Sequence, residues 1–275
     1  MPIDELLAKA AAWGVAIEGE THETPGSLLA FGVRAGRPVV LKISKFVGDE
    51  SHSGAVLKAF AEDGAVRVYA SEIGAVLLER LEPGEQLVNL VRQGDDDEAT
   101  KILATVISKL AHHRAPAECP TVEDWGRGFH RYLDSGDKQI PFELVHEAGR
   151  LYDELSATQN TRMLLHADLQ HYNVLFDKRR GWVAIDPKGV VGELEYEVGA
   201  MLRNPFEQPA LFANAATIRR RLQILTTSLA LNYSRALRWA YAQAVLSAIW
   251  GVEDGYTIEP DNPSLLLAQS LRPMI

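Results

Sequence analysis

The sequence predicts an α+β fold made of two unequal parts, a small one built on antiparallel strands and a larger helical one. Strand-like segments concentrate within residues 1–81, and helical periodicity dominates residues 88–275. Pro83 and Gly84 interrupt the chain between these two regions. We therefore expect two lobes joined by a hinge at residues 82–87.

The small lobe is expected to contain two helices, at residues 3–13 and 49–62, and two pairs of strands, at residues 27–33 with 38–43 and 66–70 with 75–79. The first helix ends at Gly14, where glycine stops the apolar repeat of IDELLAKAAAW. A turn at residues 35–37 joins the first two strands into a β-hairpin. Lys42 lies in the second strand of that hairpin, within the run VVLKIS.

The large lobe is expected to be mainly helical, because apolar residues recur at helical spacing through most of its length. The helical segments are residues 96–113, 142–157, 194–202, 215–231 and 235–250. Two short strand signals, at residues 174–176 and 182–185, flank a turn at residues 177–181. This β-hairpin is the expected sheet element of the large lobe.

The composition excludes several classes of protein. The 275 residues carry a formal net charge of −9 with a sequence pI near 5.4, which argues against nucleic acid as the partner. A single cysteine, Cys119, cannot form an internal disulfide, so a disulfide-stapled secreted fold is excluded. The N-terminus does not resemble a signal peptide, and no apolar run approaches the length of about 18 residues that indicates a membrane span. The cytoplasm is therefore the expected location.

The most informative motif begins before the β-hairpin predicted at residues 174–185 and ends directly after it. His166, Asp168 and Asn173 follow the spacing H-x-D-x-x-x-x-N. Asp186 comes directly after the strand predicted at residues 182–185. This order suits phosphoryl transfer from ATP, in which one carboxylate orients the attacking hydroxyl while an amide and a second carboxylate hold Mg²⁺. Asp168 is thus the candidate catalytic residue, and Asn173 and Asp186 are the candidate magnesium ligands. His166 is expected to support the loop.

ATP also requires a cation at its α- and β-phosphates and a surface for adenine. Lys42 has the appropriate context, an apolar strand of the small lobe. Glu50, at the start of the next helix, is its expected anionic partner, because a buried lysine without one is costly. The backbone from Glu79 to Leu81, at the junction of the lobes, is expected to contact adenine. A phosphate-binding loop is poorly marked, because residues 22–27 contain one glycine.

Each of these residues has a simpler explanation when it is considered alone. Aspartate and asparagine are most often turn or cap residues, and an acid at a helix N-terminus such as Glu50 is favoured by the helix dipole. The order of Asp168, Asn173 and Asp186 favours the catalytic interpretation, since Lys42 lies upstream in a suitable strand.

The combined pattern H-A-D-L…N…I-D-P-K-G resembles that of the aminoglycoside phosphotransferases. The continuation IDPKGVVGELEYEVGAMLRNP and the segments VVLKIS and AVLLERLEPGEQL are similar to the aminoglycoside and hydroxyurea resistance kinases, a family that includes streptomycin 6-phosphotransferases. The similarity spans roughly residues 25–205. The resemblance implies a bilobal protein-kinase-like fold, ATP and Mg²⁺ as cofactors, and a small, hydroxylated, cationic acceptor such as an aminoglycoside.

The catalytic loop departs at three positions from the usual pattern of this family, H-G-D-L-H-x-G-N. Ala167 replaces the first glycine, Gln170 the second histidine and Tyr172 the second glycine. Asp168 and Asn173 are retained, so phosphoryl transfer is still expected. Tyr172 places a large ring where the family has no side chain, which leaves the backbone of the loop and the shape of the acceptor pocket as open questions.

A cationic acceptor is expected to be surrounded by carboxylates. The candidates are Asp124, Glu193, Glu195, Glu253 and Asp254, although each alone is more often a solvated surface acid. Three functions stay open: an antibiotic kinase, a kinase of the same fold for a metabolic sugar or amino alcohol, and a nucleotide-binding relative without catalysis. The sequence does not separate the first two, because substrate pockets differ within one fold. It also leaves the oligomeric state open.

Overall fold

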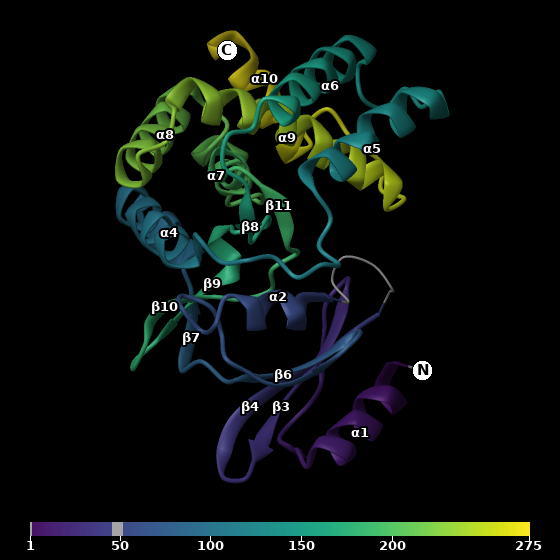
Figure 1. Ribbon diagram of the computed structural model, residues 1–275, viewed down its shortest axis with the longest axis vertical. Helices are drawn as coiled ribbons and strands as arrows, with labels where there is room; N and C mark the ends of the chain where they lie inside the picture. Colours follow the sequence, from purple (N-terminus) through teal and green to yellow (C-terminus); the bar gives the residue numbers. More distant parts are fainter. Residues whose placement is uncertain (1, 46–51) are drawn as a thin grey trace.

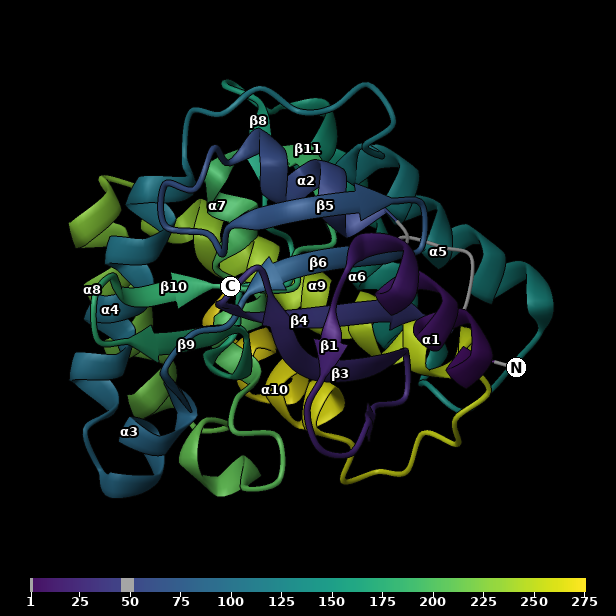
Figure 2. The same cartoon turned by 90° about the horizontal axis from the view of Figure 1, so that it is seen from below.

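The computed structural model describes residues 2–45 and 52–275, which form a small lobe and a larger helical lobe (Figure 1). The elements of the small lobe are α1 (Pro2–Trp13), β1 (Ala16–Ile17), β2 (His22–Glu23), β3 (Ser27–Arg34), β4 (Arg37–Ser44), α2 (Ser53–Ala59), β5 (Val68–Glu72) and β6 (Ala75–Glu79). The strands make one antiparallel sheet in the order β1-β3-β4-β6-β5, with β2 paired to β3. Helix α1 covers the outer face of this sheet (Figure 2), and α2 lies between the sheet and the large lobe (Figure 1).

The alternation of side chains along β4 explains why Lys42 faces the large lobe. Successive side chains of a strand point to opposite faces of the sheet. Leu41 and Ile43 belong to the buried cluster that includes Leu6 of α1. Val40 packs instead against the cluster that α2 shares with the large lobe. Lys42 lies two residues from Val40 and therefore points to the same side.

The large lobe is built from helices around short antiparallel strands. Its helices are α3 (Val88–Gln93), α4 (Asp96–Leu110), α5 (Val122–Ser135), α6 (Phe142–Ala157), α7 (Leu194–Glu197), α8 (Ala215–Leu229), α9 (Tyr233–Glu253) and α10 (Pro263–Leu271). Its strands are β7 (Pro83–Gln86), β8 (Met163–Leu165), β9 (Val174–Asp177), β10 (Gly181–Ala184) and β11 (Val190–Gly192). Strand β9 pairs with β7 and β10, and β8 pairs with β11. Across the described ranges, no helix has the length and apolarity needed to cross a membrane.

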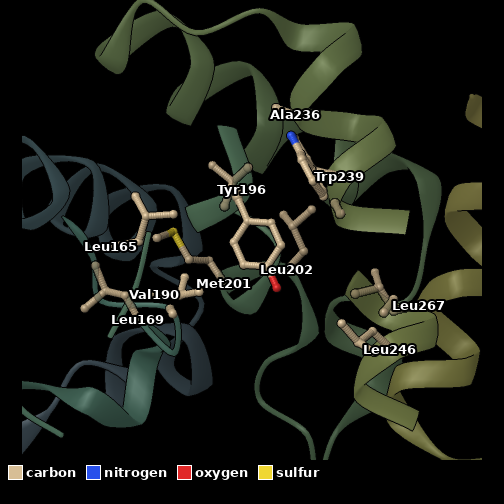
Figure 3. Packing of buried hydrophobic residues seen from close by; sticks show 14 of the residues in the cluster. Leu165, Leu169, Val190, Tyr196, Met201, Leu202, Ala236, Trp239, Leu246 and Leu267 are labelled. Atoms are coloured by element: carbon tan, nitrogen blue, oxygen red, sulfur yellow. The ribbon is translucent and has the colours of Figure 1, made fainter. Parts of the chain in front are cut away.

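The core of the large lobe surrounds Trp239 of α9. Tyr152 and Tyr196 each meet its ring edge-on, at centroid distances of 5.0 Å. Such pairs contribute about 0.5–1.5 kcal/mol beyond the burial of their area. Figure 3 shows Tyr196 and Trp239 close together, with Leu165 of β8 and Leu169 of the following loop on the left of the view. The core thus supports the strands that flank the candidate site.

Hydrogen bonds join the two lobes beside the β9–β10 hairpin. The N–H of Val66 donates to the carbonyl of Ala184 at 2.9 Å, and the N–H of Ala184 donates to the carbonyl of Gly64 at 2.7 Å. Arg180, in the turn of the hairpin, donates to the carbonyl of Ala65 at 2.9 Å. The hairpin is therefore fixed to the small lobe on this side.

The structure confirms the α+β class and most of the expected elements. The predicted segment 142–157 is α6 and the segment 75–79 is β6. The prediction of one helix at 194–202 is wrong, because α7 ends at Glu197 and a 3₁₀ helix, Ala200–Arg203, follows Gly199. The residues predicted as a hinge, 82–87, include β7, which pairs with β9.

Candidate active site

The catalytic loop lies between β8 and β9 and carries two of the predicted residues. Asn173 Nδ2 donates to the carbonyl oxygen of Asp168 at 2.9 Å and to its Oδ2 atom at 3.2 Å. Because the amide nitrogen faces Asp168, the Oδ1 atom of Asn173 is directed away from it. An amide oxygen in this orientation is available to a hard cation such as Mg²⁺.

Asp186 follows β10 and meets the small lobe. Its Oδ1 atom forms an ion pair with Nζ of Lys42. Asp186 has a φ of +61°, a conformation that aspartate adopts more readily than most residues. The N–H of Ile185 donates to the carbonyl of Asn173 at 2.9 Å, which ties this turn to the catalytic loop. The structure therefore brings Lys42, Asp168, Asn173 and Asp186 together.

His166 supports the catalytic loop through both ring nitrogens. Its Nε2 atom lies 2.9 Å from the carbonyl oxygen of Ile185, and its Nδ1 atom accepts from the N–H of Asp168 at 3.3 Å. The neutral tautomer with hydrogen on Nε2 satisfies both partners. Burial lowers the pKa of His166 to about 4, so the ring stays neutral near neutral pH. This geometry supports the expected structural role.

Glu197, the last residue of α7, binds the backbone of the catalytic loop. It was not identified from the sequence as a site residue. It is 4% exposed, and its two carboxylate oxygens accept from the N–H of Ala167 at 3.0 and 3.2 Å. Burial raises the pKa of Glu197 to about 7, and backbone N–H groups of the loop oppose this rise by stabilising the anion. An acid among helical residues usually faces solvent, so the segment ELEYE offered no distinguishing signal.

Two cations that sequence reasoning did not select lie near Asp168. Arg203 Nη2 lies 3.5 Å from Asp168 Oδ1, and the charge of Lys188 also favours the ionised carboxylate. Burial raises the pKa of Asp168, and both cations counteract that rise. Gln170 Nε2 donates to Asp168 Oδ2 at 3.4 Å. The Asp168 side chain keeps 18% of its surface exposed, so a hydroxyl group can reach it.

Tyr172 packs against the segment that follows the 3₁₀ helix Ala200–Arg203. Its ring lies 4.7 Å from that of Phe206, centroid to centroid, and its hydroxyl hydrogen bonds to Glu207. The guanidinium carbon of Arg92 lies 5.8 Å from the centre of the Tyr172 ring. These contacts account for the large side chain at this position of the loop.

The backbone of the loop retains the glycine-like conformation even though alanine occupies the position. Ala167 has a φ of +68°. We expect Ala167→Gly to leave the free energy of unfolding within about 0.5 kcal/mol of the wild type. Removal of the strain of a left-handed alanine gains about 1–2 kcal/mol, and this gain is offset by the added entropy of the unfolded glycine chain (about 0.4–1 kcal/mol) and by the lost burial of the Ala167 methyl group (about 0.8 kcal/mol). Urea denaturation measures the change. Ala11→Gly, on the exposed face of a helix, is the control and should lower stability by about 0.5–1 kcal/mol. A loss of about 1.2–1.8 kcal/mol in Ala167→Gly, the sum of the entropy and burial costs with no relief of strain, would show that the conformation is unstrained.

The segment after Asp186 also contacts α2. Gly189 has a φ of +78°, and a Cβ atom at this position would lie 2.4 Å from Cγ2 of Val56. Only glycine permits this approach, so α2 packs directly on the site. Glu50, the predicted partner of Lys42, lies outside the described residues.

The predicted adenine-binding backbone lies at the end of β6. The Glu79 carboxylate is buried, where it accepts from the N–H of Arg67 at 2.9 Å and pairs with Arg180. The N–H of Glu79 donates to the carbonyl of Arg67 at 3.0 Å, and that of Arg80 donates to Pro38 at 3.3 Å. These two N–H groups are engaged within the small lobe, so the prediction of an adenine contact rests mainly on Leu81, which is 7% exposed.

The acids predicted to bind the acceptor have other contacts in the structure. Glu193 is 2% exposed, and its carboxylate pairs with Arg235 and accepts from the indole N–H of Trp239. Asp124 forms a capping box with Thr121 at the start of α5. Both arrangements favour structural roles over binding of a substrate.

The other three candidate acids lie around α9. Glu253 pairs with Arg131 at 2.8 Å, and Glu195 accepts from the N–H of Asn232 at 3.3 Å. Asp254 is exposed and follows the last residue of α9. These contacts do not connect the acids with Asp168, so their role at an acceptor site stays a prediction.

Within residues 2–45 and 52–275, no three or more His, Cys, Asp or Glu side chains are grouped so that they could hold a metal ion. Mg²⁺ needs no such group, because it keeps several waters and binds through one or two protein oxygens together with phosphates. The donor pair Asn173 and Asp186 fits that chemistry.

Comparison with known proteins assigns the chain to a protein family. A sequence profile of the aminoglycoside/hydroxyurea antibiotic resistance kinases matches residues 12–255. The chain belongs to this family. The streptomycin 3''-kinase of Klebsiella pneumoniae is 30% identical over 248 residues, which cover 88% of this chain and 91% of that protein. The hydroxyurea phosphotransferase of Kitasatospora aureofaciens is 30% identical over 263 residues, 91% of this chain and 73% of that protein. The predicted enzyme class, a phosphotransferase with an alcohol group as acceptor, is confirmed.

Solved structures share the fold at low sequence identity. A choline/ethanolamine kinase family protein from Mesorhizobium loti superposes with a TM-score of 0.69 at 16% identity, over 100% of this chain and 95% of that one. A thermostable mutant of aminoglycoside phosphotransferase APH(4)-Ia, in ternary complex with ADP and hygromycin B, gives 0.66 at 16% identity, over 96% and 98% of the two chains. These likenesses confirm the predicted bilobal kinase-like fold.

Proposed function

We propose that this kinase transfers the γ-phosphoryl group of ATP to a hydroxyl group of a small cationic acceptor, an aminoglycoside such as streptomycin. The observation that carries the proposal is the convergence of Lys42 and Asp186 with Asp168 and Asn173 at the junction of the lobes. Relatives named as streptomycin kinases support the acceptor class. The net charge of −9 is favourable for a cation.

The two lobes have different tasks in this proposal. Residues 1–81 form the nucleotide-binding lobe, residues 82–87 the hinge, and residues 88–275 the lobe that carries the catalytic loop and the acceptor site. Lys42 contacts the α- and β-phosphates, and the backbone at Leu81 contacts adenine. Crystallisation of structural neighbours with ADP and AMP-PNP supports a nucleotide in this fold. Because ATP is the phosphoryl donor, we place the protein in the cytoplasm.

The residues around Asp186 fit a magnesium ion. The Oδ1 atom of Asn173 and the carboxylate of Asp186 are hard oxygen ligands of the kind that Mg²⁺ prefers. When bound, the ion would neutralise negative charge on the transferred group. Lys42, which already pairs with Asp186, supplies positive charge from the small lobe.

Asp168 acts on the acceptor. Its carboxylate accepts a hydrogen bond from the attacking hydroxyl and takes the proton as the new bond to phosphorus forms and the bond to ADP breaks. Arg203 and Lys188 favour the ionised form that this step requires, in opposition to the effect of burial.

A product assay tests the proposal. Purified protein with Mg-ATP and streptomycin should yield ADP and streptomycin that is heavier by one phosphoryl group in mass spectrometry. A panel of other aminoglycosides, hydroxyurea, choline and a neutral sugar separates the acceptor classes. Phosphorylation of only choline or the sugar would favour a metabolic kinase. Binding of ATP without turnover on any acceptor would favour a nucleotide-binding protein without catalysis.

A further inference from the structure

A segment of the large lobe that begins at Arg203 packs along the catalytic loop. Arg203, the last residue of the 3₁₀ helix, lies beside Asp168, with 3.5 Å between Nη2 and Oδ1. The next residue, Asn204, accepts from the N–H of His171 through its Oδ1 atom at 3.3 Å. The segment thus contacts the loop at both Asp168 and His171.

The contacts continue beyond Asn204. The Phe206 ring packs against that of Tyr172 at an interplanar angle of 36°, and Glu207 accepts from the Tyr172 hydroxyl. Four of the five residues 203–207 therefore contact residues 168–172 of the catalytic loop. We call residues 203–207 the brace.

Arg221 of α8 anchors the brace through hydrogen bonds to the backbone. Arg221 is 1% exposed, and its Nη1 atom donates to the carbonyls of Met201 at 3.1 Å and Asn204 at 2.8 Å. Its Nε and Nη2 atoms bind Asp96 of α4, with a shortest distance of 2.6 Å. A buried guanidinium is tolerated only with such complete pairing. The turn that carries Arg203 is therefore fixed to α4 and α8.

The two oxygens of the Asp168 carboxylate are held by different partners. Arg203 approaches Oδ1, whereas Asn173 and Gln170 donate to Oδ2. Rotation of the carboxylate about its side-chain bonds would break at least one of these contacts. Arg203 is partly buried, with 15% of its side chain exposed, so its position beside Asp168 is defined by the fold.

We propose that Arg203 is a positioning residue for phosphoryl transfer, which holds the Asp168 carboxylate in the orientation that meets the acceptor hydroxyl. This inference rests on the proposed function and adds a residue from outside the loop motif. Displacement of a reacting group by about 1 Å can lower turnover about 100-fold. Loss of Arg203 should therefore lower kcat and leave the binding of nucleotide unchanged.

Three substitutions at Arg203 test the proposal, with Mg-ATP and streptomycin as substrates. Arg203→Gln should lower kcat about 10–100-fold while KM for ATP stays within about twofold. Arg203→Lys should recover part of the loss, and millimolar guanidinium should partly restore Arg203→Ala in a saturable way. Arg272→Gln is the matched control, because Arg272 is an exposed arginine whose ion pair, with Glu147 of α6, involves no residue of the catalytic loop or of the brace. It should keep wild-type kcat.

The outcomes separate this inference from the proposed function. Wild-type kcat in Arg203→Gln, or a fall in kcat that matches loss of folded protein with no rescue by lysine or guanidinium, would overturn the role of Arg203. If the wild-type enzyme phosphorylates no acceptor, the proposed function fails, and crystal structures then decide the inference. An Asp168 side chain that turns away in Arg203→Gln supports it, and an unchanged orientation contradicts it.

Discussion

Replacing Asp168 by asparagine is expected to lower kcat by about 10²–10⁴-fold, the range for loss of a general base. The amide keeps the size of the side chain but cannot take a proton from the acceptor hydroxyl. Binding of Mg-ATP should stay within about twofold, because Lys42 and Asp186 are unchanged. Turnover with streptomycin and calorimetric titration with AMP-PNP measure the two effects separately.

A second aspartate provides the control for this substitution. Asp134 is exposed on α5, and Asp134→Asn should have wild-type turnover. If Asp168→Asn retains kcat within about threefold of wild type, another group performs the proton transfer and the assignment of Asp168 is wrong.

Acid should destabilise the fold through His166. Burial lowers its pKa to about 4 in the folded protein, whereas a histidine in the unfolded chain titrates near 6.5. Below pH 6.5 the unfolded chain binds a proton that the folded protein does not, so stability falls as the pH falls toward 4. The shift corresponds to about 3 kcal/mol, a large share of the 5–15 kcal/mol that is typical of a domain.

Glu197 has the opposite effect over much of the same range. Its folded pKa of about 7 lies above the ordinary value of 4.5, so the folded protein takes up a proton first as the pH falls. This uptake stabilises the fold on acidification and is complete below about pH 4.5. The contribution of His166 must therefore be measured by substitution, not from the wild-type curve alone.

Urea denaturation at pH 7 and pH 4.5 provides that measurement. His166→Gln removes the titrating ring and keeps an amide donor for the Ile185 carbonyl. The difference in stability between the two pH values should move in favour of acid by about 2–3 kcal/mol relative to wild type. His146→Gln, on an exposed helix face, should leave the wild-type difference unchanged. Equal differences in all three proteins would contradict a buried neutral His166.

The long periodic elements could be predicted from the sequence, and the short or glycine-containing ones could not. Helix α6 coincides with its predicted range because its apolar spacing is regular over 16 residues. Strands β8 and β11 have three residues each and form because they pair with one another, so neither shows a period of its own. Helix α5 contains Gly126, where an added Cβ atom would lie 2.6 Å from the ring of Tyr152. Glycine has a low helix propensity, so its presence weakened the prediction of a helix at this position.

The residues of the candidate site that belong to a loop motif were predictable, and those that act through tertiary contacts were not. Asp168, Asn173 and Asp186 follow a spacing that phosphoryl transfer requires, and Lys42 lies in a recognisable strand. Glu197 and Arg203 reach the loop only because α7 and the following 3₁₀ helix fold against it. No local pattern marks such residues.

The acceptor acids were the weakest predictions, for a physical reason. Charge complementarity indicates that acids are needed but does not indicate which acids face the site. Glu193 is the clearest example, because its carboxylate is buried against Arg235 and Trp239.

A crystal structure with AMP-PNP, Mg²⁺ and streptomycin tests the central claim most directly. We expect one metal ion to be coordinated by both Asn173 Oδ1 and Asp186, Lys42 to contact the nucleotide phosphates, and a streptomycin hydroxyl to lie within hydrogen-bond distance of Asp168. A nucleotide bound with its phosphates away from Asp186, or an acceptor hydroxyl that does not meet Asp168, would contradict the account.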